Sequence, residues 1–181
     1  MIKKLAICAA AMTLVGCGPS LEMSEDQQRF VDIVEGSKDD YSDAENSIQK
    51  SAARERRAER LCAHFADGLE VNGWQGEIDS INRTMTGDAG VELVVAKNLT
   101  LKTASSSLTF NNDTQRTLIS EESPLFRAVS ELKGGDTVQF SGAFLRGSER
   151  DCLLELSVTE SGSMRMPEFM FNFSKIEKVG G

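Results

Sequence analysis

The feature that most constrains the fold is a change of sequence pattern near Gly73. Before this point, capping boxes at Ser24 and Ser42 each precede a run of residues with helical spacing of apolar side chains. Gly36 is expected to end the first of these helices. After it, short runs of alternating apolar and polar residues are separated by turn residues, as in β-strands. One short helix interrupts these runs, between Ser123-Pro124 and Gly134-Gly135. The chain is therefore expected to be mainly β, preceded by an α-helical N-terminal segment.

The strand-like runs have the order of a small Greek-key barrel. Three runs precede the short internal helix and further runs follow it, which is the order of an OB fold. The expected strands are 74–81, 91–96, 99–103 continued through Leu108 and Phe110, 138–144, 152–158 and 168–173. Phe169, Phe171 and Phe173 share one face of the last run and are expected in the core. An eight-stranded ligand-holding barrel is the competing architecture, but the chain is a few strands short for it.

The barrel region resembles the tRNA-anti-like OB-fold lipoproteins of bacteria. The resemblance rests on Trp74-Gln75-Gly76-Glu77-Ile78 and on residues 132–142, which read Leu-Lys-Gly-Gly-Asp-Thr-Val-Gln-Phe-Ser-Gly. It covers roughly residues 71–177 and implies an OB-fold-like barrel there. It implies almost nothing about activity, because OB folds carry many unrelated functions.

The first residues resemble a bacterial lipoprotein signal. Lys3 and Lys4 precede an apolar run, and Leu14-Val15-Gly16-Cys17 has the form of a lipobox. The apolar run is shorter than the roughly 20 residues that a membrane-spanning helix needs. The resemblance implies removal of residues 1–16 and attachment of acyl chains such as palmitate to Cys17. The alternative is an ordinary signal peptide cut nearby, with Cys17 left as a free thiol.

The same resemblance places the mature chain in the cell envelope. Gly18, a non-acidic residue after the lipidated cysteine, implies the outer membrane, with the protein facing the periplasm. Loss of Lys3 and Lys4 changes the formal net charge from −8 to −10. A chain without a basic excess lacks the counterion release that dominates nucleic-acid affinity. The expected partners are therefore the membrane, through the acyl chains on Cys17, and an envelope protein or glycan, with no nucleic acid.

Two cysteines remain after removal of the signal and acylation of Cys17. Cys62 and Cys152 would lie in an oxidising compartment, where a disulfide is expected. Cys152 is expected on the apolar face of a strand with Leu154, Leu156 and Val158. Cys62 is expected on a helical apolar stripe that reads Ile48, Ala52, Cys62, Phe65 and Leu69. Two buried free thiols are the alternative.

The sequence contains few residue patterns that are typical of catalysis or metal binding. His64 is the single histidine, and it lies about 200° around the helix from Cys62, so these two side chains cannot act together. It is expected on the charged face of its helix with Arg57 and Arg60. Trp74 is expected to be packed and not exposed for sugar stacking. A thioether site for cuprous copper at Met164, Met166 and Met170 is a weaker interpretation than ordinary packing. No catalytic residue, metal or cofactor is predicted.

These interpretations divide the chain into four segments. They are a signal peptide over 1–16, a tether and short helix over 17–41, a charged helix docked on the barrel over 42–70, and the OB-fold-like domain over 71–181. The expected function is a non-enzymatic, lipid-anchored module that presents an OB-fold face to a protein or glycan. The alternative is a hydrolase of the cell wall or of glycans that uses acidic residues. A cleft with two carboxylates about 5–10 Å apart would favour that alternative.

Overall fold

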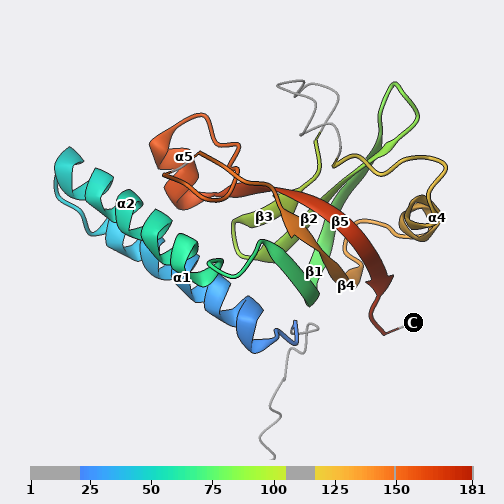
Figure 1. The fold of residues 1–181 in the computed structure, drawn as a ribbon, viewed down its shortest axis with the longest axis horizontal. Coiled ribbons are helices and arrows are strands. Elements are labelled where there is room, and N and C mark those ends of the chain that lie inside the picture. The colour runs from blue at the N-terminus through green and yellow to red at the C-terminus, as the bar shows by residue number, and fades with distance from the viewer. Residues whose placement is uncertain (1–20, 105–116, 149, 181) are drawn as a thin grey trace, which may run out of the picture.

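The computed structural model describes residues 21–104, 117–148 and 150–180. The expected signal peptide, Cys17, and the strand continuation through Leu108 and Phe110 lie outside the described residues. In chain order the elements are α1 (Glu25–Ser42), α2 (Ser47–His64), β1 (Glu70–Arg83), β2 (Ala89–Ala96), β3 (Leu99–Lys102), α4 (Pro124–Ser130), β4 (Thr137–Phe144), α5 (Glu160–Arg165) and β5 (Glu168–Lys178). Figure 1 shows the strands curled around one another, with α1 and α2 on one side and α4 on the other.

The five strands of the described residues form one mixed sheet that closes into a barrel. The order around the barrel is β1-β2-β3-β5-β4, and β4 pairs with β1 to complete the ring. All neighbours are antiparallel except β3 and β5, which run parallel through Thr100–Lys102 and Glu168–Met170. The helices of the described residues are as extensive as the strands, since α1 and α2 contain 18 residues each. The fold is therefore mixed α and β around a sheet core, and the expected mainly β class is too narrow.

Alternating side chains of the strands fill the barrel. On β2 the buried residues are Ala89, Val91, Leu93 and Val95, and the last three follow the predicted alternation. The predicted phenylalanine stripe of β5 is confirmed as core, because Phe169, Phe171 and Phe173 are all buried. Gly142 of β4 leaves room for the ring of Phe171, since a Cβ at this glycine would collide with that ring. The interior is thus a packed core and not a ligand cavity.

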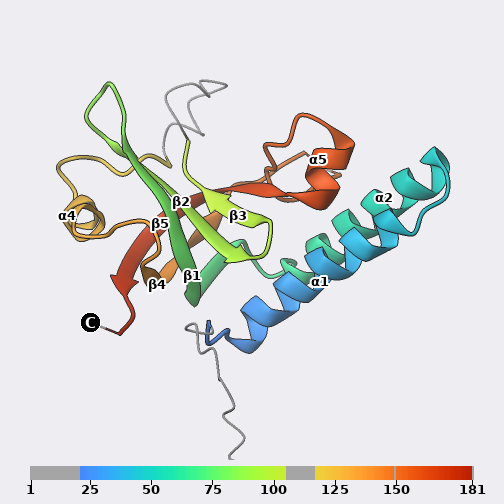
Figure 2. The same cartoon turned by 180° about the vertical axis from the view of Figure 1, so that it is seen from behind.

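Helices cover both ends of the barrel. Phe30 of α1 is fully buried at one end, where its ring contacts those of Trp74, Phe144 and Phe169. At the other end, α4 contributes the buried Val129 to the same core. The first helix is therefore part of the barrel core and not only a tether. Figure 2 shows from behind that α1 and α2 run alongside each other at the end of the barrel away from α4.

The start of α1 is joined to β1 by a side chain that imitates a strand partner. Gln27 donates from Nε2 to the carbonyl of Gln75 at 2.6 Å and accepts from the amide of Gln75 at 2.8 Å. Both groups are buried, so neither could remain unpaired without cost. Trp74 next to it donates from Nε1 to Asp26 at 3.2 Å. Trp74 is fully buried, which confirms the packed interpretation and removes it as a sugar-stacking residue.

The helix ends agree with the sequence at some positions and differ at others. The predicted N-caps Ser24 and Ser123 are confirmed, because each side chain accepts a hydrogen bond from the backbone amide three positions later in the sequence. Gly36 was expected to end α1, but it lies within the helix. α2 begins after Asn46 and not at Ser42, since the Asn46 side chain accepts from the amide of Gln49. A glycine within a helix costs about 1 kcal/mol, and the packing of α1 on the barrel and α2 outweighs this cost.

The predicted strand over 152–158 does not form. This part of the chain makes only isolated bridges, Arg146 with Leu153 and Glu155 with Phe169. Val158 was expected to face inward, but it is 99% exposed. The segment belongs to the long connection between β4 and β5, which also contains α5.

Candidate functional site

A disulfide joins the end of α2 to the connection between β4 and β5. Cys62 and Cys152 are bonded; their Cα atoms are 5.5 Å apart, and the two residues are separated by 90 positions in the sequence. The predicted pair is therefore confirmed, although the predicted strand around Cys152 is not. Cys152 instead has a φ of 50°, in the left-handed region. The sequence could predict the pairing because the other two cysteines belong to the expected signal and anchor.

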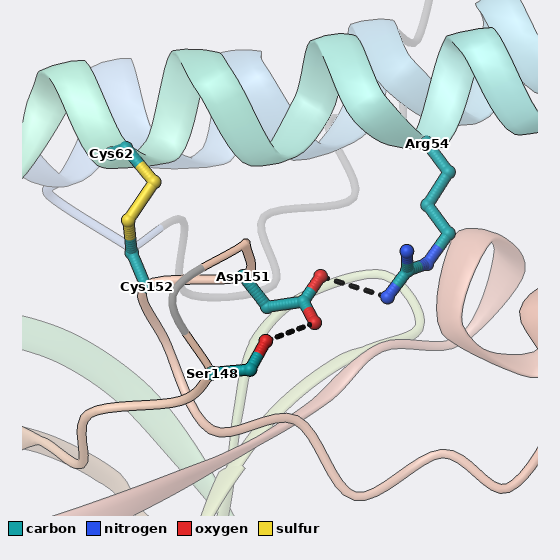
Figure 3. The surroundings of a disulfide bond; sticks show 5 residues. All are labelled: Arg54, Cys62, Ser148, Asp151 and Cys152. Carbon is teal, nitrogen blue, oxygen red and sulfur yellow. Dashed lines mark hydrogen bonds and ion pairs between the residues drawn. A yellow bond between two sulfur atoms is a disulfide. The ribbon is translucent and has the colours of Figure 1, made fainter.

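Polar contacts beside the disulfide also join α2 to the connection between β4 and β5. Asp151 accepts a hydrogen bond from Arg54 Nη2 at 2.7 Å and another from Ser148 Oγ at 2.9 Å. Figure 3 shows this carboxylate between the two donors, with the disulfide on its other side. The side chains of Arg54 and Asp151 are each 34% exposed, so the pair is accessible from solvent. The connection between β4 and β5 is thus fixed to α2 by both a covalent bond and an ion pair.

A buried ion pair lies one helical turn further along α2. Arg57 Nη2 is 3.1 Å from Glu155 Oε2, and the guanidinium also donates to the carbonyl and the hydroxyl of Ser163, each at 2.7 Å. The Ser163 hydroxyl in turn donates to Glu155 Oε2. Burial lowers the pKa of Arg57, and the carboxylate of Glu155 opposes that change.

The predicted position of Arg57 on the exposed charged face is therefore wrong. The buried residues of α2 are Ala53, Arg57 and Leu61, whereas Ile48 of the predicted apolar stripe is 81% exposed. Hydrophobic periodicity cannot identify a buried arginine whose partner is 98 residues away in the sequence. The one available signal is the spacing of Ala53, Arg57 and Leu61, which places all three on one helical face.

His64 is also buried, contrary to the prediction. Its side chain is 4% exposed and packs edge-on against Phe65, with ring centroids 4.6 Å apart. Its Nε2 lies 3.3 Å from Asp26 Oδ1, and no described residue forms a hydrogen bond with this nitrogen. Burial lowers the pKa of His64, against the opposing effect of the Asp26 carboxylate and with a smaller lowering effect from Arg29.

Stability is expected to fall as the pH decreases through the range in which free histidine titrates. The unfolded state binds a proton at His64 below about pH 6.5, whereas the folded state resists it because the pKa is lowered. The free energy of unfolding of the wild-type protein and of the His64→Gln variant is measured by denaturant between pH 5 and 7.5. The difference between the two isolates the contribution of His64, because all other titrating groups are the same in both proteins. The variant should lose part of the pH dependence. If the free energy of unfolding of the variant changes with pH as steeply as that of the wild-type protein, the result would contradict the burial of His64.

A polar pocket lies on the outer surface of β1, β2 and β3. It encloses about 190 Å³, and its lining includes Ser80, Asn82, Arg83, Glu92, Lys102 and Thr103. Glu92 lies in register between Ser80 on β1 and Lys102 on β3, so these three side chains are neighbours. Lys102 Nζ is 2.5 Å from Glu168 Oε2 on β5. The surface therefore offers donors, acceptors and both signs of charge.

Glu92 is the titratable group in the lining of this pocket whose pKa is shifted. Burial raises its pKa, nearby Asp79 and Glu168 act in the same direction, and Lys102 opposes them. The sequence could not single out Glu92, because the effect depends on burial and on neighbours from other strands. Its alternation with Val91 and Leu93 does place it on the outer face.

The acidic residues, His64 and the cysteines do not form a metal-binding cluster in the described part of the chain. Within residues 21–104, 117–148 and 150–180, no group of three or more His, Cys, Asp or Glu residues is arranged to hold an ion. Met164 is fully buried against Tyr41 and Ala53, whereas Met166 is 59% exposed. No helix among these residues is long and apolar enough to span a bilayer.

Comparisons with protein-family models, curated proteins and solved structures found no match to this chain.

Proposed function

We propose that the closed barrel is an OB fold. The strand order β1-β2-β3-β5-β4, the parallel pairing of β3 with β5 and the position of α4 between β3 and β4 all support this assignment. In OB folds, ligands bind to the outer surface of the second and third strands and to the loops beside it. The polar pocket on β1, β2 and β3 occupies this surface.

We further propose that the protein is a non-enzymatic, lipid-anchored module that presents this outer face to a protein or glycan of the cell envelope. The observation that carries the proposal is the filled barrel, in which Trp74, Phe140 and Phe171 occupy the interior and α1 and α4 cover the ends. A partner must therefore be bound on the outside. Photocrosslinking from residues on the outer face, in living cells, tests the proposal.

The anchor is proposed at Cys17, with the protein held at the outer membrane and facing the periplasm. Its support is the lipobox Leu14-Val15-Gly16-Cys17. The Cys17→Ser variant should remain an unprocessed precursor and should not incorporate labelled palmitate, because serine cannot form the thioether. The wild-type chain expressed in parallel is the control. Label retained by the variant would contradict the anchor.

Single-stranded nucleic acid is not expected to bind, despite the proposed fold. The aromatic rings of β5 that could stack on bases are buried, and the expected mature charge of −10 opposes a phosphate backbone. Titration with labelled oligonucleotides at several salt concentrations should show no more binding than an acidic control protein. Micromolar affinity that falls steeply with salt would instead show that the protein neutralises phosphates of the nucleic-acid backbone, and it would contradict the prediction.

The second candidate, a glycan hydrolase, is favoured by one observation. Burial raises the pKa of Glu92, which is the direction that favours a general acid, and Glu92 lies in the outer pocket near Asp79 and Glu168. Hydrolysis of neutral polysaccharides by the wild-type chain, abolished by Glu92→Gln, would establish this function. If the wild-type chain and the Glu92→Gln variant bind the same partner and neither hydrolyses it, the result favours the interaction module.

A further inference from the structure

A pocket on α2 gives access to the disulfide between Cys62 and Cys152. It encloses about 580 Å³, and its lining includes Arg54, Ala58 and Cys62 of α2 together with residues 150–151. Both cysteines are half-buried and not fully buried. A thiol can therefore approach the disulfide from this side, and access of this kind is one of the factors that set the rate of thiol–disulfide exchange.

The disulfide is the main link between α2 and residues 150–152. The backbone hydrogen bonds of this segment are local, since the amides of Asp151 and Cys152 both donate to the carbonyl of Ser148 at 3.1 Å. Among the described residues, its covalent and polar links to α2 are the disulfide and the Arg54–Asp151 ion pair (Figure 3). Both side chains of that pair are partly exposed, and such pairs contribute little to stability. Without the disulfide, residues 150–152 are only weakly held on α2.

The backbone of Cys152 also depends on the disulfide. Its φ of 50° lies in the left-handed region, which residues with a Cβ rarely adopt. Such a conformation persists where the surrounding structure enforces it, and the bond to Cys62 does so here. Once the bond is broken, the backbone at Cys152 is free to leave this region. That change would move Asp151 away from Arg54.

The residues that follow Cys152 are held independently of the disulfide. Leu153 is buried in the barrel core. The carbonyl of Leu154 accepts a hydrogen bond from the amide of Met170 on β5 at 2.9 Å, and Glu155 forms the buried ion pair with α2. Breaking the disulfide should therefore release residues 150–152 and leave the barrel in place.

We propose that the disulfide is a site of thiol–disulfide exchange, at which a dithiol reductant releases residues 150–152 from α2 while the barrel stays folded. The site goes beyond the proposed partner face on β1, β2 and β3 and does not depend on it. In the reduced form, the face of α2 around Cys62 and Arg54 is uncovered. The bond is thus a redox-sensitive switch for this surface.

The exchange takes place in two steps. A thiolate of the dithiol attacks Cys62 Sγ, the bond between the two cysteines breaks, and its electron pair passes to Cys152 Sγ, which takes up a proton. The second thiolate of the dithiol then attacks the mixed disulfide and releases Cys62, which is protonated in turn. The protein gains two electrons and the two protons that the dithiol gives up, and the dithiol becomes a disulfide.

Reduction of the oxidised full-length chain in detergent, without denaturant, tests the proposal. The probes are dithiothreitol, a small dithiol, and reduced thioredoxin, a protein dithiol. Alkylation followed by mass spectrometry measures the free thiols of Cys62 and Cys152. We expect both residues to be alkylated after reduction. Reduction by dithiothreitol alone would support the proposal with small dithiols as the reductant, and a bond that neither probe reduces would overturn it.

Hydrogen exchange shows what the reduction releases. The amides of Asp151 and Cys152 should exchange about tenfold faster or more in the reduced protein, because local opening no longer has to break the cross-link. The amides of β2 should keep their protection. The Cys62→Ala/Cys152→Ala variant should show the faster exchange in this segment without any reductant. Unchanged exchange at Asp151 and Cys152 after reduction, or an equal loss of protection in β2, would overturn the proposal.

Two variants of α2 test the route through the pocket. Ala58 lines the pocket, so Ala58→Phe should fill it and slow reduction by dithiothreitol about tenfold or more. Ala63→Phe is the matched control, because Ala63 is exposed and lies outside the lining. It should leave the rate unchanged. Equal rates for the wild-type chain and Ala58→Phe, or equal slowing by Ala63→Phe, would overturn this route.

Discussion

Replacing Cys152 with alanine should lower the free energy of unfolding by about 4–5 kcal/mol. The disulfide to Cys62 closes a loop of 90 residues, and the chain-entropy model of such cross-links gives a stabilisation of this size. Urea denaturation of the variant and of the wild-type protein measures the difference. The denatured, unreduced wild-type mature protein should have no titratable thiol.

Reduction provides the matched control for this prediction. Wild-type protein in a reductant should unfold at the same urea concentration as the Cys62→Ala/Cys152→Ala double variant, because both lack only the cross-link. Adding the reductant to the double variant should change nothing. A loss below about 1 kcal/mol would show that the bond is absent or contributes little to stability.

Replacing Arg57 with alanine should cost about 3–5 kcal/mol of stability. The change leaves Glu155 buried without its cation, and removing one partner of a buried ion pair is strongly destabilising. The exposed Arg56, 3.9 Å from Asp40, is the matched control on the same helix. Arg56→Ala should change stability by less than about 0.5 kcal/mol, because exposed pairs contribute little.

A double variant separates the ion pair from simple packing. Arg57→Met with Glu155→Leu removes both charges while keeping apolar volume, so it should recover most of the stability lost by Arg57→Ala. If Arg57→Ala costs no more than Arg56→Ala, the buried pair is not formed in solution. If the double variant is as unstable as Arg57→Ala, packing and not the unpaired charge explains the loss.

Local chemistry explains why much of the fold could be predicted from the sequence. Ser24 and Ser123 cap helices through contacts with residues three positions away, and Phe169, Phe171 and Phe173 alternate along one strand. These signals depend on neighbours in the chain. The disulfide could also be predicted, because the expected signal and anchor left one pair of cysteines.

The errors have long-range causes. Gly36 stays helical because α1 packs on the barrel and on α2, contacts that no local pattern contains. The segment 152–158 has alternating apolar residues but does not become a strand, because the disulfide and the ion pairs fix it to α2. Arg57 and His64 have polar side chains and were placed on the surface, yet both are buried by partners far away in the sequence.

The candidate sites were harder to predict than the fold. Glu92 and Glu155 gain their properties from residues on other strands and helices, so neither stands out in the sequence. The acidic charge of the sequence and its lack of catalytic patterns led to the hypothesis that the chain acts through a binding surface. The structure adds the positions at which such a surface can be tested.

Site-specific photocrosslinking in living cells tests the central claim, that the outer face of β1, β2 and β3 binds an envelope partner. Photoreactive residues are placed at Ser80 and Asn82, which line the outer pocket, and at the exposed Lys175 on β5 as the matched control. We expect Ser80 and Asn82 to capture the same species and Lys175 not to capture it. Capture at none of these positions, or equal capture of that species at Lys175, would contradict the claim.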